Sequence, residues 1–467
     1  MFPGSVQRAI FAALKALAVI VPASLAFSPL APAAARVASP PRRSVPSPLV
    51  APTPHVARGA EPAASLLTQD SLTDTPDGPK AQLRKFGIMP DVWVTQIYQG
   101  QPSGSASKVW RYGGKMDAFL RVDAEKLGLW RGFHMNAQFE HYIGNTIVNN
   151  DFTLLPVSVA QAFVQPQLYK SALSIFFRQE LASGFSVSAG KVNTITLASE
   201  TPLVGGGGIE TFMNRAFAAP STGIGLTAPG TLADRVVVAP TYTLGADVTY
   251  KSRFGVLNFA VVDPRNAQEP RVIQNPFKDG VVLAGSWMLP TQLFGLKSFH
   301  TFRGAYSNTR GFDLNDIGAF RQQISRDASE TKKGFWLASY SIQQYLFQSD
   351  KDPSVGWGLF GFASLSDGNP NPVKWSMLAG LAGNNLIRGR ENDRWGIGVY
   401  HYALCQPLIS GLAENGVYRR SEGGVEAFYN YAITPWLRLS ADIQIIDPWV
   451  VGKSRATFMA MRLQTKF

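Results

Sequence analysis

Hydrophobic and polar residues alternate along much of the chain after residue 82. In the last twelve residues, "ATFMAMRLQTKF", Met459, Met461 and Leu463 fall on one side, while Arg462 and Gln464 fall on the other. Side chains two positions apart point to the same face of a β-strand. The pattern therefore predicts a final strand with one apolar face and one polar face.

Three other segments show the same alternation: "WRYGGKMDAFLRVD" at 110–123, "FHMNAQFEH" at 133–141 and "LRLSADIQII" at 437–446. In each segment the residues between the polar positions are mostly apolar. These segments predict strands that are apolar on one side only. Their polar faces carry Arg111, Lys115, Asp117 and Arg121; His134, Asn136, Gln138 and Glu140; and Arg438, Ser440, Asp442 and Gln444.

The connections between such segments differ in length. Short ones such as "AEKLG" and "TPW" alternate with long ones at 144–167, 198–240 and 308–332. Short turns at one end and long loops at the other are typical of outer-membrane barrels, in which an even number of strands closes the sheet. We predict an all-β fold: a transmembrane antiparallel β-barrel of about sixteen strands over residues 81–467, with long extracellular loops. The alternative is a secreted β-sandwich or propeller, whose strands are usually about 5 to 6 residues long.

The first 80 residues have a different texture. Residues 1–35 place Arg8 and Lys15 before an apolar stretch and then small residues, as a cleaved secretory signal peptide does. A retained anchor helix is the alternative, but Pro22 interrupts the apolar stretch. Residues 36–80 are rich in Pro, Ala and Ser and lack aromatic residues, which predicts an extended or disordered segment. We expect export to the outer membrane of a Gram-negative bacterium.

The formal charge of +12 leaves three kinds of partner open: nucleic acid, an anionic surface or solutes in a basic cavity. The basic residues are scattered singly among aromatic residues and glycines, which argues against nucleic acid. Subtracting +2 for residues 1–35 and +1 for residues 36–80 leaves about +9 on the predicted barrel. A lumen with this excess predicts a modest anion preference. The single cysteine, Cys405, excludes an intramolecular disulfide.

An enzyme is the main competing class, and the chain carries no recognisable catalytic motif. None of the five histidines lies in a nucleophile or zinc motif. The glycine run "VGGGGIE" at 204–210 lacks the Gly-Lys-Ser/Thr end of a phosphate-binding loop. We therefore predict no catalytic site, no cofactor and no metal.

Several of these segments resemble the carbohydrate-selective porins of the OprB family. "LRKFGIMPDVWVTQIYQG" resembles the opening strand of that family, and "YGGKMDAFLRVDAEKLGLWRGFHMNAQFEHYIGN" its second and third strands. "ETFMNRAFA" is similar to a motif in the family's third loop, and "ENGVYRRSEGGVEAFYNYAITPWLRLSADIQIIDP" to its closing hairpins. The resemblance implies a sixteen-stranded barrel, passive uptake of sugars and a narrow, charged constriction with the third loop folded inward. It places Glu210, Asn214 and Arg215 in that constriction loop.

Polar side chains on the inner face offer donors and acceptors that replace the hydration of a sugar, and the planar guanidinium of arginine bridges neighbouring hydroxyls. Aromatic side chains, for which we consider Phe119, Phe458 and Tyr400, stack on pyranose rings. The alternative role for the charges is to pair across strands and brace the wall. The predicted channel-lining and sugar-contacting residues are Arg111, Lys115, Asp117, Arg121, Glu140, Glu426, Arg438, Asp442, Gln444 and Arg462.

The expected function is passive diffusion of carbohydrates, monosaccharides such as glucose and small oligosaccharides, through a charged, water-filled channel. A general or anion-preferring diffusion porin is the alternative, and a barrel enzyme or an adhesin follows at greater distance. The terminal Phe467 resembles the C-terminal signal that the barrel assembly machinery recognises, and we place it on the lipid face. The expected partners are carbohydrate solutes, outer-membrane lipid and that machinery; whether the chain forms a homo-oligomer stays open.

Overall fold

The structure, a computed structural model, describes residues 66–106, 108–147, 152–161, 171–194, 202–205, 208–220, 242–265, 275–316 and 331–467. All of them belong to one compact unit, Ser47–Phe467. The predicted signal peptide and most of the proline-rich segment lie outside the described residues. No helix of the described part is long and apolar enough to span a membrane.

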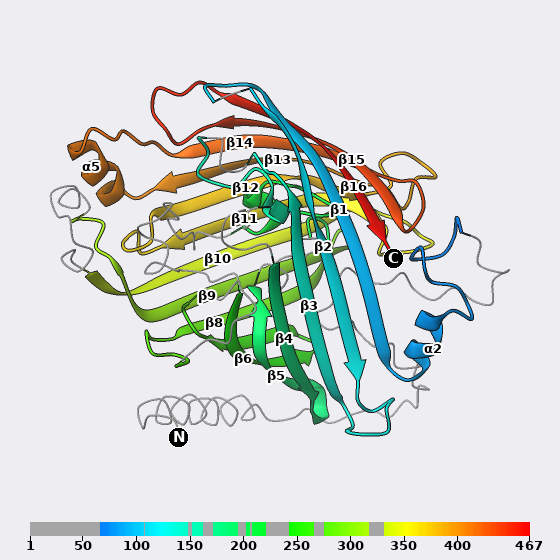
Figure 1. The fold of residues 1–467 in the computed structure, drawn as a ribbon. Helices are drawn as coiled ribbons and strands as arrows, with labels where there is room; N and C mark the ends of the chain where they lie inside the picture. Colours follow the sequence, from blue (N-terminus) through cyan, green and yellow to red (C-terminus); the bar gives the residue numbers. More distant parts are fainter. Residues whose placement is uncertain are drawn as a thin grey trace. The chain divides into compact units, whose positions relative to one another are not determined.

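The described residues form a closed barrel of sixteen strands in which every neighbouring pair is antiparallel (Figure 1). The strand count and the fold class agree with the prediction. The short helices among the described residues are α2 (Pro79–Lys85), η1 (Val159–Gln161), η2 (Ala182–Gly184), α4 (Arg215–Ala218) and α5 (Gln406–Glu414). The strands are β1 Ile88–Ser103, β2 Trp110–Asp123, β3 Phe133–Gly144, β4 Ser171–Glu180, β5 Phe185–Asn193, β6 Tyr242–Ser252, β7 Gly255–Val262, β8 Val282–Leu293, β9 Leu296–Phe312, β10 Thr331–Gln348, β11 Gly356–Ser366, β12 Val373–Asn384, β13 Arg394–Leu404, β14 Glu422–Ala432, β15 Leu437–Asp447 and β16 Ala456–Lys466.

The first and last strands close the barrel. Ile97 of β1 lies opposite Arg462 of β16, and the ladder continues to the pair Trp93 and Lys466. Because closure pairs both edges, no strand edge is left exposed to hydrocarbon. The side chain of Met461 is 55% exposed, whereas that of Arg462 is 1% exposed. The last strand therefore has the two faces that its alternation predicts.

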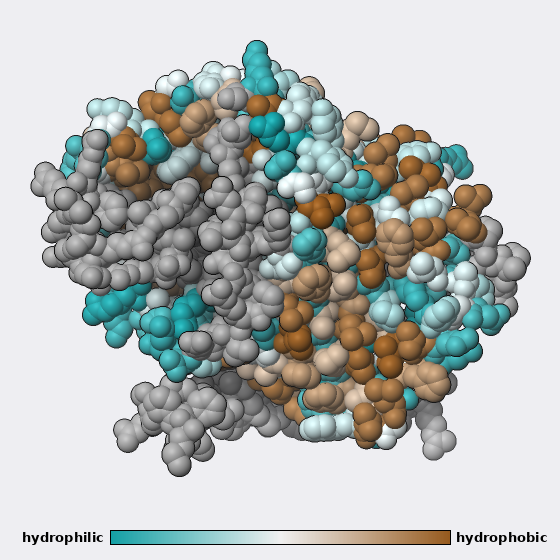
Figure 2. Space-filling model, viewed as in Figure 1, coloured by the Kyte–Doolittle hydropathy of each residue, from teal (hydrophilic) through white to brown (hydrophobic). Residues whose placement is uncertain are grey.

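Apolar side chains cover the outer face of the strands. Figure 2 shows them in brown across the visible wall, with hydrophilic side chains, in teal, gathered toward its margins. Outward residues such as Leu359, Ile397 and Val399 are each about half exposed. A one-residue shift would move all of them to the lumen, so the apolar face fixes the register of each strand.

The connections are short at one end of the barrel and long at the other. The turns at 181–184, 253–254 and 433–436 join neighbouring strands directly, as predicted. The predicted loop at 308–332 is shorter than expected, because β9 continues to Phe312 and β10 begins at Thr331. The ladder extends through polar residues there, since backbone groups pair whether or not the strand has an apolar face.

Residues 66–80 correct the prediction of an extended or disordered segment. The N–H of Leu72 bonds to the carbonyl of Lys466 at 2.8 Å, and the indole N–H of Trp436 bonds to the carbonyl of Leu66 at 2.7 Å. The ammonium of Lys80 lies 2.8 Å from Asp91 and 2.8 Å from the main-chain oxygen of Phe467. This stretch has no core of its own; its polar groups find partners on the barrel end beside the seam.

Candidate channel and constriction

The loop between β5 and β6 spans residues 194–241; its described residues 202–205 and 208–220, which we call L3, lie inside the barrel. The buried carboxylate of Glu426 on β14 accepts hydrogen bonds from the backbone N–H groups of Met213 and Asn214. The side-chain amide of Asn214 donates to Gln444 of β15 at 3.1 Å and accepts from the N–H of Ala216, where it caps α4. These inward-facing side chains from two strands hold the turn of L3 against the inner wall.

Two further charged groups, Arg462 and Glu210, help to hold L3 against the inner wall. We call the contacts that hold L3 there the loop clamp. The guanidinium of Arg462 donates to the carbonyls of Gly208 at 2.5 Å and Thr211 at 2.9 Å. Glu210 of L3 forms ion pairs with Lys466 at 2.6 Å and Arg394 at 3.7 Å. Burial would raise the pKa of Glu210, but these cations and the nearby Arg438 outweigh burial and hold the pKa below its usual value. Glu210 therefore stays ionised and paired at neutral pH.

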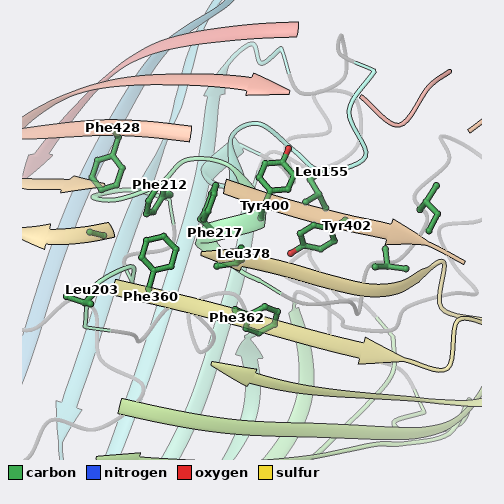
Figure 3. Packing of buried hydrophobic residues seen from close by; sticks show 14 of the residues in the cluster. Leu155, Leu203, Phe212, Phe217, Phe360, Phe362, Leu378, Tyr400, Tyr402 and Phe428 are labelled. Atoms are coloured by element: carbon green, nitrogen blue, oxygen red, sulfur yellow. The ribbon is translucent and has the colours of Figure 1, made fainter. Parts of the chain in front are cut away.

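An aromatic cluster anchors the same loop (Figure 3). Phe212 and Phe217 of L3 stack with ring centroids 4.5 Å apart, and Phe212 meets Phe428 of β14 edge-on at 4.8 Å. Gly396 and Gly398 of β13 make room for these rings, since a Cβ would lie 2.7 Å from Phe212 at the first glycine and 2.6 Å from Phe217 at the second. The missing side chains on β13 thus create the flat surface on which L3 packs.

A second loop also enters the barrel, which the sequence did not reveal. The loop between β3 and β4 spans residues 145–170; we call its described residues 145–147 and 152–161 L2. The carboxylate of Glu422 on β14 accepts from the N–H groups of Leu154 and Leu155, and Gln444 donates to the carbonyl of Val157 at 2.8 Å. L2 and L3 then pair with each other: Val159 donates its N–H to Met213 at 2.8 Å. The two loops form one layer inside the β13–β16 wall.

A buried charge cluster lies on β2 and β3. The ammonium of Lys115 contacts Glu140 at 2.5 Å and Asp117 at 3.0 Å. Glu140 also accepts hydrogen bonds from the phenol of Tyr242 and, at 2.9 Å, from Asn193. The cluster ties β2 and β3 to the strands that flank L3.

A continuous row of polar side chains crosses ten neighbouring strands, each paired with the next across the ladder. Its side chains face the lumen, because Gln343, on the same face of β10 as Ser339, binds the N–H of Leu203 in L3. Four members on β7 to β10, namely Asn258, Ser286, Arg303 and Ser339, are partly exposed, while the other six are buried. We call this set the polar row; from β5 to β14 it comprises Ser186, Thr249, Asn258, Ser286, Arg303, Ser339, Ser364, Ser376, Tyr402 and Glu422.

Comparison with protein families matches residues 108–467 to the carbohydrate-selective porin, OprB family. The chain belongs to the OprB family. Family and fold together make it a sugar-passing channel, a porin of the Gram-negative outer membrane. A comparison with curated proteins finds no match.

Among solved structures, the high-pH structure of Pseudomonas putida OprB aligns with a TM-score of 0.73 at 16% identity. The alignment covers 86% of this chain and 100% of that one, and at this identity it supports the fold alone. The low-pH structure of the same protein aligns with a TM-score of 0.48 at 14% identity, over 86% and 99% of the two chains. Pseudomonas aeruginosa OccK11 aligns with a TM-score of 0.44 at 8% identity, over 81% and 96%.

Most of the predicted channel residues of this porin lie on the inner face, but they bind the protein itself. Eight of them are each 6% exposed or less: Lys115, Asp117, Glu140, Glu426, Arg438, Asp442, Gln444 and Arg462. Asp442 accepts from Gln444 at 3.0 Å, and Arg438 donates to Asn430 at 2.9 Å. This arrangement corresponds to the alternative of bracing charges, and direct contact of these residues with a sugar stays a prediction.

The remaining predicted residues are distributed differently. Arg121 is partly exposed and lies 3.8 Å from Asp91, whereas Arg111 is exposed and bonds to the carbonyl of Trp110 at 3.3 Å. Of the predicted aromatic residues, Phe458 and Tyr400 are buried, and Phe119 stays partly exposed beside Trp93. The residues predicted for the constriction, Glu210, Asn214 and Arg215, all lie in L3, and their role in a constriction stays a prediction. The N–H of Phe467 bonds to the carbonyl of Val92 at 2.7 Å, next to the seam.

Proposed function

We propose that monosaccharides and small oligosaccharides diffuse passively through this porin along the exposed stretch of the polar row on β7 to β10. One observation carries the proposal: the charged residues near L2 and L3 bind the loops, while Asn258, Ser286, Arg303 and Ser339 are partly exposed. Hydroxyl and amide groups both donate and accept, as sugar hydroxyls do. A sugar can therefore exchange its water for protein contacts in steps along this stretch.

Such contacts need to be weak and repeated for transport. A permeating solute must leave as readily as it enters, so several small sites in sequence serve better than one tight site. Asn258 already donates to Thr249 at 2.9 Å and to Asp247 at 3.0 Å, which fixes the orientation of its amide. Ser286 and Ser339 flank Arg303 on the neighbouring strands. The stretch thus offers oriented polar groups on four successive strands.

The proposal is tested by reconstituting the purified protein in planar bilayers and titrating glucose against the ion current. We expect saturable block in the wild type and a severalfold higher half-blocking concentration in the Ser286→Ala/Ser339→Ala variant. The matched control is Ser364→Ala/Ser376→Ala, which removes two hydroxyls from the buried part of the same row. Current without any sugar block would instead favour a general diffusion porin. No current at all would favour an adhesin.

We also propose that residues 1–35 are removed on export and that Phe467 is read by the barrel assembly machinery. The charged and apolar pattern of residues 1–35 supports the first part. The second rests on the terminal aromatic of the closing strand, which pairs with β1 at the seam. Sequencing the N-terminus of the purified outer-membrane protein tests cleavage, and the surface level of Phe467→Ser tests recognition. An intact leader, or full assembly of that variant, would contradict the respective part.

A further inference from the structure

We infer that Arg303 gives this pore a preference for carboxylated monosaccharides, such as aldonates and uronates, over neutral sugars of the same size. The inference rests on the proposed path along β7 to β10. Arg303 is the only charged member of the exposed stretch of the polar row, and its side chain is partly exposed. Its neighbours along β9, Phe302 at 46% exposure and Tyr306 at 53%, belong to the outer face.

Arg303 differs from the other lumen cations in its partners. Within the described residues it forms no ion pair, and its one hydrogen bond joins Nη1 to the hydroxyl of Ser341 at 3.5 Å. The residues opposite it on both neighbouring strands, Ser286 and Ser339, are neutral. Asp247, an acid on β6, accepts hydrogen bonds from Thr249 and Asn258.

Four other inward cations among the described residues are engaged. Lys115 contacts two carboxylates, Arg394 and Lys466 share Glu210, and Arg462 is bound to loop carbonyls. Their charged groups are paired with carboxylates or bound to backbone carbonyls of the loops. Arg303 therefore retains both its charge and most of its donor groups for a passing solute.

The ligand chemistry follows from this environment. A planar guanidinium pairs with a carboxylate through two parallel hydrogen bonds, and lysine does not reproduce that geometry. The serine and asparagine groups on either side can bind the hydroxyls of the same molecule. A sugar acid thus matches the stretch better than a neutral sugar, which lacks the group that Arg303 binds best.

The test measures tracer efflux of gluconate and glucose from proteoliposomes at 0.1 M KCl. We expect wild type to release gluconate faster than glucose by roughly threefold to tenfold, the low end of electrostatic focusing in a charged path. Arg303→Gln should abolish this ratio, and Arg303→Lys should retain only part of it. The matched control is Arg310→Gln, which removes one positive charge from an exposed position on the same strand. Heat-modifiable migration on gels confirms that each variant is a folded barrel.

The outcomes separate this inference from the proposed function. An unchanged ratio in Arg303→Gln overturns the inference, and so does an equal loss of the ratio in Arg310→Gln, which would assign the effect to overall charge. A wild-type ratio of one also overturns it. Absence of glucose efflux from wild-type vesicles contradicts the proposed function itself.

Discussion

Arg462 offers the sharpest test of the loop clamp. Methionine has a long, unbranched side chain like that of arginine but cannot donate hydrogen bonds. Arg462→Met therefore removes the hydrogen bonds to Gly208 and Thr211 of L3. A hydrogen bond to a charged group contributes about 1.5 to 3 kcal/mol, so the two together stabilise the docked loop by about 3 to 6 kcal/mol. Water in the lumen can replace part of this, and we take the lower end. About 3 kcal/mol raises the population of undocked L3 roughly a hundredfold.

The assay is single-channel recording in planar bilayers. We expect Arg462→Met to show a higher mean conductance and more open-channel noise than wild type, because L3 leaves the lumen more often. Arg455→Met is the control, since its guanidinium pairs with Asp447 at 2.9 Å on the exposed surface and does not contact L3. If conductance and noise of Arg462→Met equal those of wild type, the clamp does not depend on this residue and the reasoning from its contacts is wrong.

Three further predictions concern the lipid face of the wall and the contacts of L3. Met461→Arg places a charge on the lipid face and should lower barrel stability by about 2 to 4 kcal/mol if the residue lies near the bilayer midplane, measured by urea unfolding in lipid vesicles; normal stability would show that the faces are reversed. Gly398→Val should displace Phe217 and raise conductance as Arg462→Met does, at a cost of about 1 to 3 kcal/mol from overpacking. Because the folded pKa of Glu210 is depressed, its stabilising contribution is present above the ordinary carboxyl pKa and is lost only as pH falls through the lower folded value. Wild type and Glu210→Gln should therefore show the same pH dependence of conductance between pH 7 and pH 5, and a rise within that window in wild type alone would contradict the pairing of Glu210 with Lys466.

The closing strands could be predicted in detail because their sequence alternates without interruption. The outward residues along the middle of β15 and β16 are apolar, and a register shift would bury Met461 and expose Arg462 to lipid. The inward side of Arg462 follows from the strand's own sequence. What Arg462 binds does not follow, because Gly208 and Thr211 lie about 250 positions away in the chain, and no local pattern joins them to β16.

L2 shows the limit of local patterns more clearly. Leu155 and Val157 are fully buried inside the barrel, yet they stand in an irregular segment with neither a strand nor a helix period. Their position is set by the carboxylate of Glu422, which binds backbone N–H groups and so is indifferent to the side chains of the loop. A weak signal existed: a long extracellular loop with several apolar residues needs something to pack against.

The polar row could not be predicted from the sequence, for a different reason. Each strand contributes only one member, often a serine or a threonine, and a single hydroxyl in a strand carries little information. Asn258, Ser286 and Arg303 become neighbours only once the ladders of β7, β8 and β9 are aligned. Register between strands, which depends on the whole apolar surface, creates the set.

On the β13–β16 wall the lumen charges bind the loops, whereas on β7 to β10 polar groups are partly exposed. The net charge of this porin therefore does not by itself predict its ion selectivity. If Arg438 and Arg462 acted only as fixed lumen charges, replacing both by Ala would shift ion selectivity toward cations. Arg438, however, holds Asn430 and the carbonyl of Asn392, each at 2.9 Å, and Arg462 holds L3. Their loss would alter the shape of the channel as well as its charge, so a change in selectivity would have two causes. Within the described residues Arg303 holds only the hydroxyl of Ser341, at 3.5 Å, and no loop, so a shift in selectivity on its replacement would report the field that a solute meets.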